Sequence, residues 1–329
     1  MNKTLFVALI IIVNFIIVYL TIAAVLVISG RPRQTKPTQS NLSFKQLIFD
    51  YARLPQLQTF TARDGKQLAY RHYSAQTNKI LILLHGAAWH SRYFLPLAEF
   101  ITSQNLAQVY TPDLRGHGIK PERRGDVDYI GQLEDDLADL MAMISQSNPN
   151  AKFVIGGHSS GGGLALRFAG GQYGHQASAY LLLSPFLKYN APTIRPNSGE
   201  WTIPYTRRII GLTMLNNIGI KWFNDSTVIE FNMPKEVRDG TETLFYSYRL
   251  NTSYASRDYK KDLRAINKPL LVVVGNKDEA FIADRFEYVI SQYTQGKVKL
   301  LNGVTHMGLV VGPEIRPVIK EWFESLNND

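Results

Sequence analysis

The sequence predicts an α/β fold with a mostly parallel central sheet. From about residue 57 onwards, short apolar runs of strand length alternate with amphipathic segments of helical length. Several of these runs are apolar throughout, such as Ile80 to Leu84 and Leu270 to Val274. Such continuous runs are typical of parallel strands that are buried on both faces.

The individual elements can be placed along the chain in order. Leu57 to Ala62 and Gln67 to Tyr73 flank the pair Asp64-Gly65, which is typical of a hairpin turn. Further strands are expected at 80–84, 107–111, 153–155, 179–183, 270–274 and 298–301. Helices are expected at 91–104, 129–147, 162–169, 280–293 and 313–326. Strands and helices therefore alternate through residues 46–187 and 263–329, which we assign to the core.

Residues 188–262 interrupt this alternation. They contain several helical patches and many aromatic side chains, but no long apolar strand run. The strand pattern then resumes at Leu270, which favours an insertion over an independent second domain. We expect a mainly helical cap over the carboxyl edge of the sheet, where α/β folds bind their ligands.

The first 30 residues predict a transmembrane anchor. Leu5 to Ile28 carries no charge, and a helix of this length spans about 36 Å, enough to cross a hydrocarbon core of about 30 Å. A cleaved signal peptide is the alternative, with small residues before a cut at Ala23 or Ser29, although its apolar region usually has only about 7 to 15 residues. Basic residues flank both ends, so the sequence leaves open which side of the membrane holds the remaining chain.

The cysteine content and the net charge exclude several kinds of site and partner. The 329 residues include no cysteine, which excludes a disulfide framework, a thiolate nucleophile and a sulfur-based zinc site. The net charge is +9, of which residues 1–45 carry +5, because they hold five basic residues and no acid. The basic charge therefore indicates a bilayer surface and not a nucleic acid partner. We interpret residues 31–45 as a polar tether between anchor and core.

The strongest local motif is Gly157-His158-Ser159-Ser160-Gly161, between an expected strand and an expected helix. In this setting G-x-S-x-G predicts a tight strand-to-helix elbow that holds Ser159 at the edge of the sheet. The two glycines are needed because a Cβ atom at either position would collide with neighbouring backbone. A phosphate-binding loop is the alternative, but the lysine of a Walker motif is missing.

A serine becomes a nucleophile when a histidine accepts its proton and an acid orients that histidine. His306 follows the last expected strand on a loop that also contains two glycines. Asp278 follows the strand before it, with Glu279 as its immediate rival. Their order in the chain, Ser159, Asp278 and His306, differs from the orders of chymotrypsin and subtilisin.

An acyl-transfer site also needs backbone donors for the oxyanion. The N–H group of Ser160, the residue after the nucleophile, is one candidate. The loop after strand 80–84 reads His85-Gly86-Ala87-Ala88, and we assign the second donor to Ala87. We interpret His85 as a residue that shapes this loop.

One acidic segment suggests metal binding at first sight. Glu134, Asp135, Asp136 and Asp139 lie close together on the helix expected at 129–147. We interpret them as a solvated helix face and predict no metal site.

Taken with Asp113-Leu114-Arg115-Gly116-His117-Gly118, these motifs resemble those of α/β hydrolases of the monoacylglycerol lipase and lysophospholipase type, also called the serine aminopeptidase S33 or Hydrolase_4 group. The resemblance extends from about Phe60 to Phe323. In such proteins the 113–118 segment is structural, so His117 is not placed in the catalytic set.

The resemblance implies a serine hydrolase that cleaves a carboxylic ester without a cofactor, with a monoacylglycerol or a lysophospholipid as substrate. The expected anchor, which monoacylglycerol lipases of this family usually lack, places it at a membrane. Thioesterase, aminopeptidase and other acyl hydrolase activities use the same triad and are alternatives. A catalytically silent, membrane-anchored binding protein is a further alternative from another class. The lipid bilayer, contacted through residues 5–28, is the expected partner.

Overall fold

A computed structural model describes residues 3–30, 42–196 and 201–326 of the chain. Its central sheet has eight strands in the order β1-β2-β4-β3-β5-β6-β10-β11. Strand β2 is antiparallel to β1 and β4, and the remaining neighbours are parallel. The strands are β1 (Gln58–Thr61), β2 (Gln67–Tyr73), β3 (Lys79–Leu84), β4 (Gln108–Pro112), β5 (Lys152–His158), β6 (Ala179–Leu183), β10 (Leu270–Gly275) and β11 (Lys297–Leu301). The predicted α/β fold with a mostly parallel sheet is confirmed.

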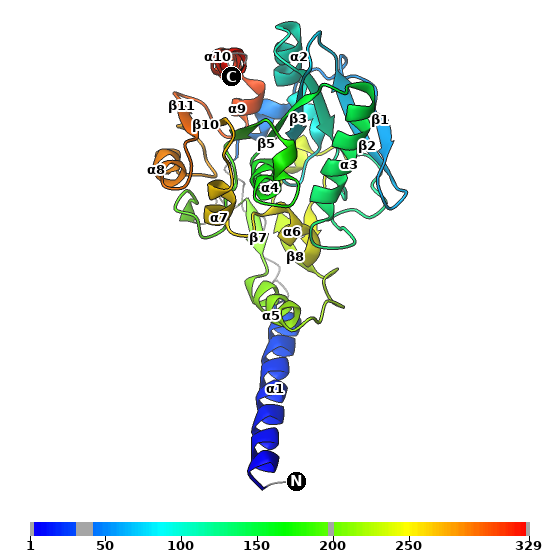
Figure 1. Cartoon of the computed structure of the whole chain (residues 1–329), viewed down its shortest axis with the longest axis vertical. Coiled ribbons are helices and arrows are strands. Elements are labelled where there is room, and N and C mark those ends of the chain that lie inside the picture. The colour runs from blue at the N-terminus through cyan, green and yellow to red at the C-terminus, as the bar shows by residue number, and fades with distance from the viewer. Residues whose placement is uncertain (1–2, 31–41, 197–200, 327–329) are drawn as a thin grey trace.

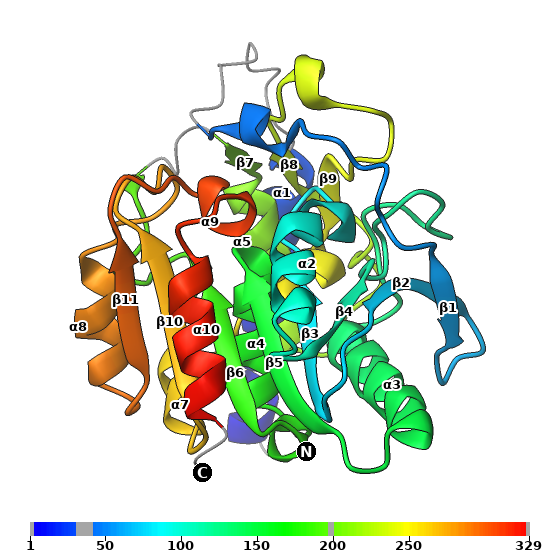
Figure 2. The same cartoon turned by 90° about the horizontal axis from the view of Figure 1, so that it is seen from above.

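Helices cover both faces of this sheet. On one face, α2 (Leu95–Ser103) packs against α9 (Gly308–Val311) and α10 (Arg316–Ser325), and Figure 2 shows α2 and α10 side by side in front of the strands. On the other face, α3 (Gln132–Ser147) packs against α4 (Ser160–Ala169). Helix α8 (Arg285–Ser291) lies beside β11. The short 3₁₀ helices η2 (Ser91–Phe94) and η3 (Gly174–Gln176) join some of these elements.

One expected helix is much shorter than predicted. We expected a helix at 280–293, and only α8 forms. The residues before it turn around Asp278, whose Oδ1 atom accepts hydrogen bonds from the N–H groups of Ala280 and Phe281, both at 2.8 Å. The backbone that follows is paired with residues 193–194 and not with its own helix, since the Ile282 N–H group donates to the Thr193 carbonyl oxygen at 2.8 Å.

The cap region combines helices with a small sheet. It contains α5 (Thr206–Asn217), η5 (Lys235–Val237), α6 (Tyr248–Tyr254) and the start of α7 (Tyr259–Arg264). Strands β7 (Thr202–Pro204), β8 (Thr227–Phe231) and β9 (Phe245–Ser247) form an antiparallel sheet that the sequence did not predict. Runs of three to five residues are too short to show a strand period clearly. The cap reaches the carboxyl edge of the main sheet, where the Thr243 N–H group donates to the Ala88 carbonyl oxygen at 3.0 Å.

Helix α1 (Lys3–Ser29) is the one helix of the described chain that is long and apolar enough to cross a membrane. It extends away from the rest of the protein, and its C-terminal part meets α5 of the cap (Figure 1). The contact is close: Ala23 is fully buried, and a Cβ atom added to Gly211 would lie 2.7 Å from the Ala23 carbonyl oxygen. The Tyr19 hydroxyl also donates to the Met214 carbonyl oxygen at 2.9 Å. The apolar helix therefore contacts the cap directly.

The end of the predicted tether is folded onto the core. Residues 31–41 lie outside the described residues. Leu42 and Phe44, which we assigned to the tether, are buried, and Phe44 begins the 3₁₀ helix η1 (Phe44–Leu47). A tether therefore has to end before Leu42.

The acidic residues of α3 differ from the solvated face that we expected. Glu134 and Asp136 are buried, and each pairs with an arginine. Glu134 contacts Arg167 at 2.6 Å, and Asp136 contacts Arg115 at 2.7 Å. The expectation was wrong because a helical pattern does not reveal which long cationic side chains fold over it from other elements.

Candidate active site

Ser159 lies at the elbow between β5 and α4, with φ 55° and ψ −120°. A positive φ is unfavourable for a residue with a side chain and has to be imposed by its surroundings. Here the Ser159 N–H group donates to the Leu183 carbonyl oxygen at 2.9 Å, and the Ser159 carbonyl oxygen accepts from the Gly163 N–H group at 3.1 Å. The backbone thus forms the tight turn that the motif predicts.

The two outer glycines of the motif allow this turn. A Cβ atom at Gly157 would overlap the backbone of Gly161, and one at Gly161 would overlap the carbonyl of Leu84 at the end of β3. The elbow is therefore packed both on itself and on the neighbouring strand. Any larger residue at either position requires the backbone to move.

Asp278 and His306 form a buried pair on the loops that follow β10 and β11. The Asp278 Oδ2 atom lies 2.8 Å from His306 Nδ1, and each residue has 1% of its surface exposed. The other carboxylate oxygen accepts the two backbone N–H groups at 280 and 281, so the Asp278 side chain is fixed in orientation. This geometry places a proton on Nδ1 and leaves Nε2 of His306 as a base.

The pair also sets the proton affinity of the imidazole. Burial favours the neutral form of His306, but the adjacent Asp278 carboxylate outweighs this effect and raises the pKa of His306 above its usual 6.5. Burial likewise acts to raise the pKa of Asp278, but the His306 charge and hydrogen bond lower it below its usual 3.8. Asp278 therefore stays ionised at neutral pH.

The sequence left Asp278 and Glu279 as rivals, and the structure separates them. Of these two carboxylates, only that of Asp278 contacts the His306 ring. The Glu279 carboxylate instead accepts the backbone N–H group of His306 at 2.8 Å. The two neighbouring carboxylates thus hold two different parts of the same histidine.

His306 is held beside the elbow by His158, the second residue of the motif. The Nε2 atom of His158 lies 3.1 Å from the His306 carbonyl oxygen, and the two imidazole centres are 4.6 Å apart. Burial lowers the pKa of His158 well below 6.5, so its ring is neutral, with one donor and one acceptor nitrogen. Among the described residues no hydrogen bond joins the Ser159 hydroxyl to His306. Such contacts often tighten only when substrate is bound.

The loop that we expected to supply an oxyanion donor is braced by two tyrosines. The Gly86 N–H group donates to the Tyr93 hydroxyl at 2.7 Å, and the Ala88 N–H group donates to the Tyr246 hydroxyl at 2.8 Å. Among the described residues, the Ala87 N–H group between them has no hydrogen-bond partner. It is therefore available to an external acceptor.

The second expected donor, the Ser160 N–H group, lies at the first position of α4. The first N–H groups of a helix have no partner within the helix, and the positive end of the helix dipole favours an anion there. The elbow lies next to the Ala87 loop, because a Cβ atom at Gly86 would lie 3.2 Å from Ser159 Cβ. Both predicted donors are thus on loops that adjoin Ser159.

Sequence reasoning missed the roles of Tyr93 and His158. The Tyr93 hydroxyl lies 3.1 Å from His158 Nδ1 while it accepts the Gly86 N–H group. A continuous chain of hydrogen bonds thus runs from the Gly86 loop through Tyr93 and His158 to the His306 backbone. The motif marks position 158 as variable, and nothing in the local sequence indicates Tyr93.

His85 and His117 are buried and bind the protein backbone or other side chains. His85 Nε2 accepts the Leu114 N–H group at 3.0 Å, and His85 Nδ1 lies 2.8 Å from the Gly86 carbonyl oxygen. His117 Nε2 lies 2.7 Å from the Tyr246 hydroxyl. These contacts fit the loop-shaping role expected for His85 and the exclusion of His117 from the catalytic set.

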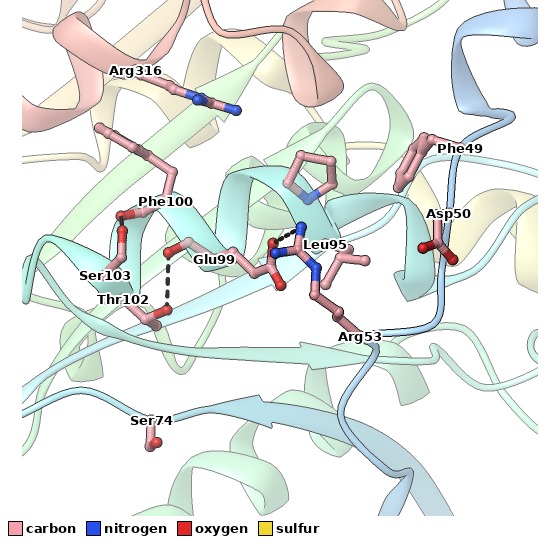
Figure 3. A pocket seen from close by; sticks show the side chains of 11 residues that line it. Phe49, Asp50, Arg53, Ser74, Leu95, Glu99, Phe100, Thr102, Ser103 and Arg316 are labelled. Carbon is pink, nitrogen blue, oxygen red and sulfur yellow. Dashed lines mark hydrogen bonds and ion pairs between the residues drawn. The ribbon is translucent and has the colours of Figure 1, made fainter.

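A pocket of about 640 Å³ lies away from these residues, between the segment 49–53 and helices α2 and α10 (Figure 3). Arg53 and Glu99 form an ion pair of 3.0 Å there, and both are partly exposed to solvent. None of the predicted site residues lines this pocket. In the described part of the chain, no group of three or more histidine or acidic side chains is placed to hold a metal ion.

Comparisons with known proteins identify the family of the chain. The family model of Hydrolase_4, the serine aminopeptidase S33 family, matches residues 75–310. The human monoglyceride lipase is 24% identical over 310 residues, which cover 90% of this chain and 94% of that protein. The monoacylglycerol lipase of Mycolicibacterium smegmatis is 26% identical over 129 residues, which cover 39% of this chain and 45% of that protein.

A solved structure of a soluble variant of the monoglyceride lipase of Saccharomyces cerevisiae, in complex with a substrate analogue, superimposes with a TM-score of 0.61. It is 16% identical in sequence, and the superposition covers 91% of this chain and 99% of that one. The family model alone spans more than two thirds of the sequence. The chain is therefore an α/β hydrolase of the monoacylglycerol lipase type and belongs to the Hydrolase_4 (serine aminopeptidase S33) family.

Proposed function

We propose that this protein is a serine hydrolase that cleaves carboxylic esters of membrane lipids, with a monoacylglycerol or a lysophospholipid as substrate. The observation that carries the proposal is the buried Asp278–His306 pair, tied through the His158 contacts to the elbow on which Ser159 lies. An intact pair of this kind beside a strained serine is the arrangement that activates a hydroxyl nucleophile.

In the proposed reaction the Ser159 hydroxyl attacks the ester carbonyl and gives its proton to His306 Nε2. The Ala87 and Ser160 N–H groups stabilise the oxyanion, each contributing about 2.7 to 4 kcal/mol to the transition state. Collapse of the tetrahedral intermediate breaks the ester C–O bond, and His306 returns the proton to the leaving alcohol. Water then attacks the acyl-serine with His306 again as base, releasing the fatty acid and restoring the Ser159 hydroxyl.

Asp278 has one role throughout this cycle. Its hydrogen bond to Nδ1 keeps Nε2 unprotonated in the resting state, and its charge stabilises the imidazolium that forms during attack. Because Asp278 is itself held by two backbone N–H groups, it does not rotate away between steps.

The membrane part of the proposal is supported by the end of the molecule beside α1. Four apolar side chains on or just after α5 are exposed, namely Ile210 at 47%, Ile218 at 49%, Trp222 at 84% and Phe223 at 49%. Exposed aromatic and apolar groups next to an apolar helix are typical of surfaces that contact lipid. The relatives named as monoglyceride or monoacylglycerol lipases support a glycerolipid substrate.

We further propose that α1 is an uncleaved anchor and not a signal peptide. Ala23 packs into the cap against α5, and the Arg208 guanidinium donates to the Val27 carbonyl oxygen at 3.3 Å. A cleaved leader has no need to fit the folded protein in this way. Residues 5–28 would hold the hydrolase at the bilayer.

The test is Ser159→Ala in the full chain, purified in detergent. We expect the variant to lose labelling by a fluorophosphonate and hydrolysis of all esters, while its thermal unfolding stays close to that of the wild type. Labelling of the wild type but not of Ser159→Ala supports the nucleophile. Equal labelling of both proteins would rule out Ser159.

The substrate class requires a panel of acyl compounds: glycerol esters, lysophospholipids, short p-nitrophenyl esters, acyl thioesters and aminoacyl amides. We expect the highest kcat/KM with a long-chain glycerol ester or a lysophospholipid. A clear preference for thioesters or amides would replace the lipase by one of the other acyl hydrolases. No labelling and no turnover by the wild type would favour the catalytically silent binding protein.

A further inference from the structure

Residues 42–47, which we call the strap, cover the loops of the candidate active site. Their apolar side chains Leu42, Phe44 and Leu47 are all buried. The Phe44 ring lies 4.7 Å from Trp201 of the cap and 6.4 Å from Trp89, two residues beyond Ala87. The strap therefore contacts the cap and the expected oxyanion loop at the same time.

The polar side of the strap contacts the loop that carries His306. The Glu279 Oε1 atom accepts the Ser43 N–H group at 3.2 Å and the Ser43 hydroxyl at 2.5 Å. The other oxygen of the same carboxylate, Oε2, accepts the His306 N–H group at 2.8 Å. One residue earlier, the Thr305 hydroxyl donates to Gln46 Oε1 at 2.6 Å. The Glu279 side chain is thus the bridge between the strap and the backbone of His306.

This bridge has a geometric consequence for the imidazole. Asp278 fixes the ring of His306 through Nδ1, and Glu279 fixes the backbone from which that ring extends. Misplacement of a catalytic base by about 1 Å has a large effect on rate. The two carboxylates hold His306 at two points, and the second point depends on the strap.

The bridge also has an electrostatic consequence. Burial favours neutral His306, and Asp278 provides most of the opposing effect, but the charge of Glu279 also raises the pKa of His306. The imidazolium formed when Ser159 is deprotonated is therefore stabilised by both carboxylates. Loss of the Glu279 charge lowers the pKa of His306, and loss of Ser43 alone leaves the charge in place.

On the basis of the proposed function, we propose that Glu279 is a positioning residue for His306 and that the strap, through Ser43, completes this role. The segment that follows the anchor and tether is then part of the active site. It is more than a connection between membrane and enzyme.

The experiment compares Glu279→Gln, Ser43→Ala and the control Glu287→Gln, using a soluble p-nitrophenyl ester and the full chain in detergent. Glu287 is an exposed carboxylate on α8 for which no hydrogen bond or ion pair is described, so its variant removes the same charge elsewhere. For Glu279→Gln we expect kcat to fall about 10-fold with little change in KM, as for loss of a hydrogen bond to a charged group. The wild type should lose kcat/KM as the pH falls through a His306 pKa above 6.5, because the base must be neutral.

The pH profile separates positioning from simple loop stability. In Glu279→Gln the acidic limb of kcat/KM should move to lower pH, whereas in Ser43→Ala kcat should fall several-fold with the limb unmoved. If Glu279→Gln fails to fold, the Ser43→Ala result and a Gln46→Ala variant still test the strap. The proposal would be overturned if Glu279→Gln and Ser43→Ala both had the kcat of the wild type and the same acidic limb in the pH profile.

Fluorophosphonate labelling separates this outcome from failure of the proposed function. Wild type that labels at Ser159 while Glu279→Gln behaves like Glu287→Gln would leave the hydrolase assignment intact and reject only the positioning role. Wild type that neither labels nor hydrolyses any ester would reject both.

Discussion

The N-terminal part of the chain meets the rest of the protein at two contacts that differ in what they join. Helix α1 packs on α5 of the cap through close backbone approach, with Ala23 against Gly211. The strap packs through buried apolar side chains, and Ser43 also donates hydrogen bonds to Glu279, which binds the backbone of His306. The first contact combines close packing with hydrogen bonds from Tyr19 and Arg208 to backbone carbonyl oxygens, and it joins the anchor to the cap. The second contact ends at a candidate catalytic loop.

The comparison indicates what each contact controls. Changes at the α1–α5 contact should affect stability and the attachment of the cap, since no predicted catalytic residue lies there. Changes at the strap should affect both stability and the rate of the proposed reaction. The predictions below are ordered by expected size and test this division.

The largest expected effect on the reaction comes from changing the Asp278–His306 pair, which lies next to the strap contact. Asp278→Asn should lower kcat/KM for a soluble ester by about 10⁴-fold, because an amide at this position favours the wrong imidazole tautomer. Glu279→Gln, at the next position in the sequence, should lower kcat/KM only about 10-fold. Steady-state kinetics on both variants check this, and a larger loss from Glu279→Gln would transfer the orienting role to Glu279.

A smaller effect is expected when the apolar side of the strap is truncated. Phe44→Ala removes a ring that is 2% exposed and should lower the free energy of unfolding by about 3 to 5 kcal/mol, through lost burial and the cavity left behind. Because the ring contacts Trp89 and Trp201, kcat should fall as well. Chemical denaturation followed by tryptophan fluorescence measures the stability.

The matched control for this variant is Phe223→Ala, which truncates a phenylalanine that is 49% exposed. It should change the free energy of unfolding by less than about 0.5 kcal/mol. Equal stability of the two variants in detergent would mean that the strap is not packed on the core in solution.

The smallest effect on the reaction is expected at the other contact. Gly211→Leu places a side chain against the backbone of α1 and should cost about 1 to 3 kcal/mol of stability through overpacking. On a soluble ester in detergent, kcat should stay within about two-fold of the wild type, because the catalytic loops are not touched. Ile210→Leu, an exposed and volume-conserving change on the same helix, is the control. A loss of kcat in Gly211→Leu as large as in Glu279→Gln would remove the distinction between the contacts.

Much of the site followed from local patterns. The elbow around Ser159 was predictable because the motif, the strand before it and the helix after it lie within about 20 residues. Asp278 and His306 could be proposed because each follows a strand of the parallel sheet, and the carboxyl ends of parallel strands meet at one edge of the sheet. The small sheet β7-β8-β9 of the cap was missed because its strands are short and only partly buried.

The sequence by itself determined the fold class, the apolar N-terminal helix and the candidate catalytic residues. Only the tertiary structure decided that Asp278 faces the imidazole while Glu279 binds the backbone, and that Tyr93 and His158 link the loops. It also decided that the strap lies on the loop carrying His306, more than 250 residues away in sequence. The physical reason is that strand and helix periods are encoded locally. Hydrogen bonds between distant loops depend on where the packed sheet brings those loops together.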